Sequence, residues 1–340
     1  MATDWHSSMM SCGETIIIIE NMAVEINGKT HGISASSTQT QDSKICYPCP
    51  KNEWSDEKKV KCVPKQLEFL SYNDIISLIY VALVILFSLV TLLIITTFIY
   101  YWDSPIVKAN NLNMSLILLV SILLSFLSVF FFLGRPVDIT CMLRQVLCGT
   151  IFTVGISSVL SKTITVCIAF KATKPGSFWR KWISPKISNY VVIICSSIQV
   201  LNCVIWLFLS PPYVELDHST FEGKILIQCH EGSFLAFYLM LGYMGLLASV
   251  SFVLAFMVRT LPDSFNEAKY ITFSMLLFCS VWIAMIPAYL STRGKYMVAV
   301  EIFAILSSSS GILGCIFLPK MYLLLVKPQL RVNKKYFRKK

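Results

Sequence analysis

The stretch from residue 75 to residue 102, IISLIYVALVILFSLVTLLIITTFIYYW, contains no charged residue. A helix of about 20 apolar residues is long enough to cross the roughly 30 Å of hydrocarbon in a bilayer. A buried strand in a soluble α/β core would run only about 4–8 residues. This stretch is therefore expected to form a membrane-spanning helix.

Six further stretches have the same character: apart from Arg144, the first residue of the third span, the only charges in them are Lys162 and Glu301. The seven expected spans are residues 75–102, 109–134, 144–170, 187–210, 232–258, 270–292 and 296–319. Only 14% of the 340 residues are charged, against about a quarter in a soluble domain. Backbone polar groups must be satisfied within each span. The sequence thus predicts an all-α membrane protein, a seven-transmembrane helix bundle.

Basic residues give the orientation of this bundle. The loops after the first, third and fifth spans, together with the C-terminal tail, carry sixteen Lys and Arg residues, whereas the alternate loops carry five. The positive-inside rule then places the N-terminus outside and the C-terminus in the cytosol. The net charge of +10 is read as a signal of topology, and we expect no nucleic-acid partner.

Outside the spans, the chain divides into three further parts. Residues 1–44 form an atypical N-terminal segment, rich in Ser and Thr from 34 to 43 and expected to be disordered, without a recognisable signal peptide. Residues 45–72 contain Cys46, Cys49 and Cys62. The seven-span domain covers 73–328, and 329–340 is a basic tail that could rest on anionic lipid.

Catalysis is not expected of this chain. All four histidines lie in outside segments, and neither His-Glu-x-x-His nor Gly-x-Ser-x-Gly occurs. The group of Cys46, Cys49 and Cys62 lacks a fourth ligand nearby, which favours disulfides over a zinc site. We expect no enzyme, no metal and no cofactor. A transporter would usually show internal repeats or several polar residues at mid-depth.

The two charges within spans each have two interpretations. Lys162 lies about 27 Å along a helix from Arg144, near the cytosolic end, and could be a functional cation or a lysine that snorkels to the interface. Glu301 lies near the outer end of the seventh span and could be functional or interfacial. Cys141 and Cys229 both face the oxidising side, where a disulfide between them is plausible.

Several ordered motifs resemble those of class C G-protein-coupled receptors. The longest is RTLPDSFNEAKYITFS at residues 259–274, before the sixth span. The others are SPIVKAN at 104–110, where Ser104 replaces the family's Thr, QCHEGS at 228–233, CSVWIAMIPAY at 279–289 and FLPKMY at 317–322. MVAVEIFAIL at 297–306 and GILGCIF at 311–317 look most like vomeronasal type-2 receptors. The calcium-sensing receptor is the next most similar, through RKW at 180–182 and WIAMIPAY at 282–289.

This resemblance implies roles for individual residues. Lys162 and Glu267 match the pair that joins the third helix to the foot of the sixth in the resting state. Cys141 and Cys229 match the family's bridge over the bundle, and by family spacing Cys49 pairs with Cys62. The upper transmembrane cavity for modulators corresponds to Arg144, Gln145, Trp282, Tyr289 and Glu301, although Trp282 and Tyr289 could equally be packed aromatics.

The resemblance also implies partners. A heterotrimeric G protein would bind loops 103–108, 171–186 and 259–269, with Arg180, Lys181, Phe265, Asn266 and Lys269 contributing to coupling. Pro319 and Lys320 match the end of the seventh helix. The receptor would form a homodimer or a heterodimer with another class C receptor in the plasma membrane.

The domain that binds agonists in this family has no counterpart in this sequence. Family agonists, amino acids or peptide pheromones, bind a large bilobed ectodomain joined by a cysteine-rich linker, of which only residues 46–62 are recognisable here. Cys46 lacks its usual partner, and either Cys12 or a second chain could supply one. We therefore expect the signalling part of a chemosensory receptor. The alternatives are a non-signalling accessory subunit of a full-length receptor and a calcium- or amino-acid-sensing relative.

Overall fold

The computed structural model describes residues 10–12, 46–50, 52–56, 61–104, 111–171, 185–218, 223–258 and 266–326. The chain separates into two compact units. One contains residues 1–68 and 216–226, and the other contains residues 69–215 and 227–340. The second unit contains every long helix of the described chain.

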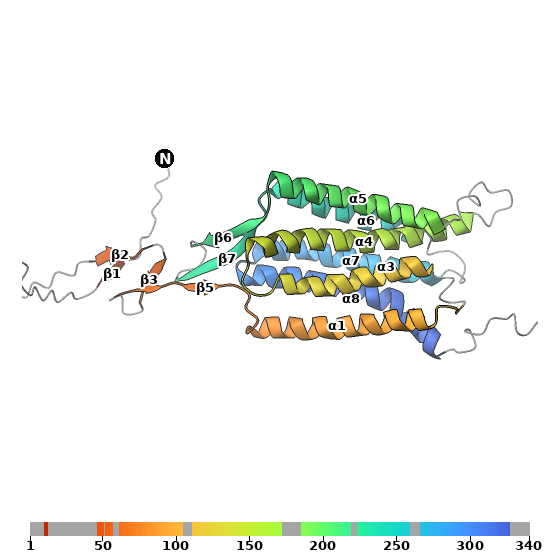
Figure 1. Ribbon diagram of the computed structural model, residues 1–340, viewed down its shortest axis with the longest axis horizontal. Helices are drawn as coiled ribbons and strands as arrows, with labels where there is room; N and C mark the ends of the chain where they lie inside the picture. Colours follow the sequence, from red (N-terminus) through yellow and green to blue (C-terminus); the bar gives the residue numbers. More distant parts are fainter. Residues whose placement is uncertain are drawn as a thin grey trace, which may run out of the picture. The chain divides into compact units, whose positions relative to one another are not determined.

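Seven helices of the described residues are long and apolar enough to cross a membrane, as the sequence predicts. They are α1 (Ile75–Tyr100), α3 (Leu112–Ser128), α4 (Asp138–Lys171), α5 (Pro185–Leu209), α6 (Phe234–Val258), α7 (Asn266–Ser291) and α8 (Lys295–Val326). A short 3-10 turn, η1 (Val129–Phe131), continues α3. Figure 1 shows the helices running side by side, with α1 at one edge of the view and α5 at the other.

Helix α4 is the most enclosed of the seven. In the most apolar segment of α4, 61% of the residues are buried, whereas only 17% are buried in the corresponding segment of α1. A helix that faces lipid on most sides is expected to be apolar all round. Helix α1 fits this description, because its most apolar segment has the highest mean hydropathy of the seven, 3.1. The polar and charged residues of the bundle interior can therefore be expected on α4.

The start of α4 and the end of α8 differ from the sequence-based prediction, and both differences have the same cause. Helix α4 begins at Asp138, six residues before Arg144, and α8 continues through Pro319 to Val326. The prediction took charged residues as the limits of spans, but Arg144 and Lys320 are only 6% exposed and lie inside their helices. A charge enclosed by protein does not end a membrane helix.

Hydrogen bonds between helices supplement the packing of apolar side chains. The hydroxyl groups of Ser125 in α3 and Ser309 in α8 are 2.7 Å apart. The Tyr80 hydroxyl in α1 donates to the carbonyl of Ala299 in α8 at 2.9 Å. In a bilayer, such bonds and close van der Waals packing hold helices together, because lipid is as apolar as the helix surfaces.

Short strands lie in the segments outside the helices, where the prediction had only a linker and loops. They are β1 (Met10–Cys12), β2 (Cys46–Pro48), β3 (Glu53–Ser55), β4 (Cys62–Pro64), β5 (Gln66–Glu68), β6 (Tyr213–Asp217) and β7 (Lys224–His230). β1 pairs with β2 and β3 with β4, both antiparallel, and a third sheet has the order β5-β7-β6. Opposite residues of β1 and β2 include Cys12 and Cys46.

Two disulfides are present in the described chain. Cys49 is joined to Cys62 in the first unit, and Cys141 at the start of α4 is joined to Cys229 at the end of β7 in the second. The second bond closes 88 residues and fixes the segment before α6 to the outer end of α4. It places the residues that follow Cys229 over the outer end of the bundle.

Replacing both Cys141 and Cys229 by serine is expected to destabilise the bundle. Loss of a native disulfide typically costs about 2–5 kcal/mol, so the purified chain should melt at a lower temperature and less of it should reach the cell surface. Cys315→Ser, which changes a thiol outside any disulfide, is the control. An unchanged melting temperature in the double variant would contradict this role.

The close packing of α7 on α8 depends on Gly311. A Cβ atom at this position would collide with the end of the Leu277 side chain in α7. Gly311→Leu should therefore lower the melting temperature, whereas Gly245→Leu should not, because nothing lies within 4 Å of a Cβ atom at Gly245 in α6. Equal effects of the two substitutions would show that helix propensity rather than packing decides the result.

Candidate transmembrane ligand site

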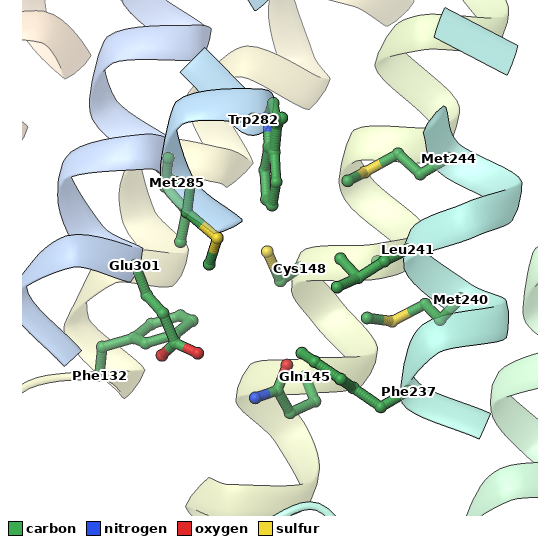
Figure 2. A pocket seen from close by; sticks show the side chains of 12 residues that line it. Phe132, Gln145, Cys148, Phe237, Met240, Leu241, Met244, Trp282, Met285 and Glu301 are labelled. Carbon is green, nitrogen blue, oxygen red and sulfur yellow. The ribbon is translucent and has the colours of Figure 1, made fainter. Parts of the chain in front are cut away.

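A small cavity lies in the outer half of the bundle, between α4, α6, α7 and α8. Its volume is about 20 Å³, enough for one water molecule and far below the several hundred Å³ of a typical ligand site. The lining consists of Phe132, Gln145, Cys148, Gly149, Phe237, Met240, Leu241, Met244, Trp282, Met285, Glu301 and Ile305. Figure 2 shows these side chains converging from four helices and from the end of η1.

Flexible side chains close most of this cavity. Met240 and Met244 reach it from α6 and Met285 reaches it from α7, with Trp282 one turn before Met285 (Figure 2). Methionine has three rotatable bonds and a polarisable sulfur, so it adapts to irregular spaces more readily than a branched side chain. The cavity can therefore enlarge by rotation of side chains, without displacement of a helix.

A buried ion pair lies at the outer side of the cavity. The side chains of Arg144 in α4 and Glu301 in α8 are 7% and 8% exposed, and their closest nitrogen and oxygen atoms are 3.8 Å apart. The guanidinium also lies over the Phe132 ring, 5.2 Å from its centre. Glu301 is thus enclosed by protein, and the interfacial interpretation of this residue is wrong.

Glu231, which is not among the predicted site residues, joins this group. Its side chain accepts a hydrogen bond from the Tyr289 hydroxyl at 2.9 Å, and its backbone carbonyl accepts one from the Trp206 indole at 3.1 Å. Glu231 follows the disulfide-bonded Cys229 by two residues, which could have indicated a fixed position over the bundle. The buried polar groups at this end of the bundle thus include two carboxylates, Glu231 and Glu301, and one guanidinium, Arg144.

Three cavity-lining residues carry buried polar atoms without a hydrogen-bond partner in the described structure. These atoms are Gln145 Nε2, Trp282 Nε1 and Glu301 Oε2. Leaving one such atom unsatisfied typically costs about 1–3 kcal/mol. Glu301 Oε2 is the atom that lies 3.8 Å from Arg144, so the two donors are the groups still available to water or to a small ligand with an acceptor group.

The structure thus places the five residues of the expected modulator cavity in two neighbouring groups. Gln145, Trp282 and Glu301 line the cavity, while Arg144 pairs with Glu301 and Tyr289 bonds Glu231. Trp282 also makes edge contact with the Phe152 ring, at 5.6 Å between centres, so it is a packed aromatic as well as a cavity residue.

At the opposite end of the bundle, Lys162 of α4 is 4% exposed. Its ammonium group donates to the Ser115 hydroxyl of α3 at 2.8 Å. The snorkelling interpretation is therefore wrong, because the side chain does not extend to the interface. Glu267 lies in the first turn of α7, and its side chain falls outside the described part of the structure.

The expected coupling residues lie at the same end as far as they are described. Arg180, Lys181 and Phe265 fall outside the described residues, whereas Asn266 and Lys269 lie in the first turn of α7. Pro319 and Lys320 lie within α8, one and a half turns or more before its end at Val326. Lys320 is buried, with its ammonium group 6.0 Å from the centre of the Phe317 ring.

Comparison with known proteins identifies the family. Residues 70–320 match the family model described as the 7 transmembrane sweet-taste receptor of 3 GCPR. The chain is 49% identical to vomeronasal type-2 receptor 26 of Mus musculus, over 87% of this chain and 35% of that protein. Its identity to vomeronasal type-2 receptor 116 of Mus musculus is 46%, over 83% and 33% of the two chains.

Calcium-sensing receptors are also similar. The extracellular calcium-sensing receptor of Homo sapiens is 44% identical, over 83% of this chain and 28% of that protein. The chain therefore spans about a third of the length of the curated relatives it matches. The matched part is the transmembrane part of these receptors, which are not enzymes. This chain is a multi-pass plasma membrane protein that belongs to the class C G-protein-coupled receptor family.

Proposed function

We propose that this chain is the transmembrane signalling part of a chemosensory class C receptor and that it activates a heterotrimeric G protein. The observation that carries the proposal is the 49% identity to a vomeronasal type-2 receptor over 87% of this chain. The match to the family model covers residues 70–320, which contain most of the helical bundle and the loops between its helices.

The proposed switch is an ion pair between Lys162 in α4 and Glu267 in the first turn of α7. Burial of the Lys162 ammonium supports it, because a cation enclosed by protein within the membrane is usually compensated by an opposite charge or by polar groups nearby. At about 4 Å and an effective dielectric constant of about 20, such a pair has roughly 4 kcal/mol of Coulomb energy before desolvation. Separation of the pair would let α7 move away from α4.

In this account, the cytosolic loops then bind the G protein. Residues 103–108, 171–186 and 259–269 would form the contact surface, with Arg180, Lys181, Phe265, Asn266 and Lys269 as coupling residues. The stimulus would come from an agonist on the bilobed ectodomain of a receptor dimer, as the relatives' chemosensory names suggest. A modulator in the cavity between Gln145, Trp282 and Glu301 would bias the same equilibrium from within the membrane.

Charge reversal tests the switch. Glu267→Lys should raise basal nucleotide exchange on the G protein, because two like charges replace the proposed pair. Combining Glu267→Lys with Lys162→Glu restores opposite charges and should lower basal exchange again. The measurement is guanine nucleotide exchange in membranes that contain equal amounts of surface-expressed chain.

Glu215→Lys is the matched control, since it makes the same charge change on β6, in the extracellular loop between α5 and α6. Flat basal exchange in Glu267→Lys, from a chain that otherwise stimulates exchange, would refute the ion pair. If the unaltered chain never stimulates exchange but restores the surface expression of a full-length relative, the accessory-subunit alternative holds instead.

A further inference from the structure

A groove on the membrane-facing side of the bundle lies between the outer halves of α7 and α8. Its volume is about 670 Å³, and Tyr80 of α1 closes one side. Small residues form much of the wall, namely Ala284 and Ala288 on α7 with Ala299 and Ala304 on α8. Small side chains at adjacent positions leave a channel along the helix pair instead of a filled surface.

The depth of the groove matches one leaflet of the bilayer. Its lining runs from Ser280 on α7 to Thr292, directly after that helix, and from Tyr296 to Ala304 on α8. At 1.5 Å per residue these segments are about 18 Å and about 12 Å long. Half of the hydrocarbon thickness is about 15 Å. The groove therefore extends from the outer interface to near the bilayer centre.

Positive charge lies at the outer end of this groove. Arg293 is exposed in the turn that joins α7 to α8. The Lys295 ammonium lies 5.9 Å from the centre of the Tyr296 ring, which lines the groove, and also pairs with Asp74 at 3.2 Å. Helix α8 begins at Lys295, so the positive end of its dipole points the same way. The outer end thus suits an anionic group at the level of lipid phosphates.

We propose that this groove binds one phospholipid of the outer leaflet, with an acyl chain between α7 and α8 and its phosphate beside Arg293. A linear chain fits a channel that is one leaflet deep, and the phosphate complements the charges at its end. A second copy of this chain fits less well. In a symmetric dimer the same Arg293 and Lys295 of both copies would approach each other at the same depth.

Photolabelling tests the proposal directly. The full chain is placed in phosphatidylcholine vesicles that contain a small fraction of phosphatidylcholine with a diazirine on one acyl chain, and labelled peptides are mapped by mass spectrometry. We expect labelling of residues 280–304 to exceed labelling of the lipid-exposed face of α1 (Ile75–Tyr100). Equal labelling of both would mean that ordinary surrounding lipid covers the groove, and it would overturn the proposal.

Two variants separate the groove from the rest of the surface. Ala288→Trp fills the channel and should remove the excess labelling, whereas Ala82→Trp, on the exposed face of α1, should leave it intact. Arg293→Glu changes only an exposed turn, so it should fold normally, and it should weaken labelling by repelling the phosphate. Persistent excess labelling in Ala288→Trp would overturn the proposal. Absence of label from a wild-type dimer would also overturn it, because a second copy would then cover the groove.

Discussion

Enclosing positive charge inside a membrane protein is the constraint on which the bundle depends. Helix α4 carries Arg144 near its outer end and Lys162 near its inner end, and both are at most 6% exposed. A cation inside the membrane-spanning part of a helix is costly when it faces lipid, so both lie against protein. This requirement explains why α4 is the most enclosed helix, while α1 carries no charge and lies at the edge of the bundle.

The two cations give the bundle two polar levels with an apolar core between them. At the outer level, Arg144 pairs with Glu301, and Glu231 and Tyr289 lie beside the cavity. At the inner level, Lys162 donates to Ser115. The core between the levels contains the rings of Phe152, Phe278 and Trp282 in mutual contact. An event at one level would reach the other by rotation or displacement of α4 and α7, and we infer that this is the physical basis of receptor switching.

The sequence was sufficient for the number, type and approximate position of the helices, because charge-free stretches of membrane length have few alternative folds. It failed at Arg144 and Lys320, where charges lie inside helices and were taken as their limits. Glu231 was missed because the partner of its carboxylate, Tyr289, lies 58 residues away along the chain. The three methionines of the cavity carried no signal, since Met240, Met244 and Met285 resemble any lipid-facing apolar residue until the helices are placed. The resemblance to class C receptors, by contrast, brought Gln145, Trp282 and Glu301 together before the fold was known.

The most direct test of the account is a distance across the cytosolic end of the bundle. Spin labels at Ile168 of α4 and Phe273 of α7, introduced through a non-natural amino acid that leaves the native cysteines unchanged, report the separation of these two helices. With the chain in nanodiscs, the account predicts a single short distance. Addition of a nucleotide-free heterotrimeric G protein should then populate a second, longer distance. If the distribution is the same with and without a G protein that binds the chain, opening of α7 from α4 is not how this receptor signals.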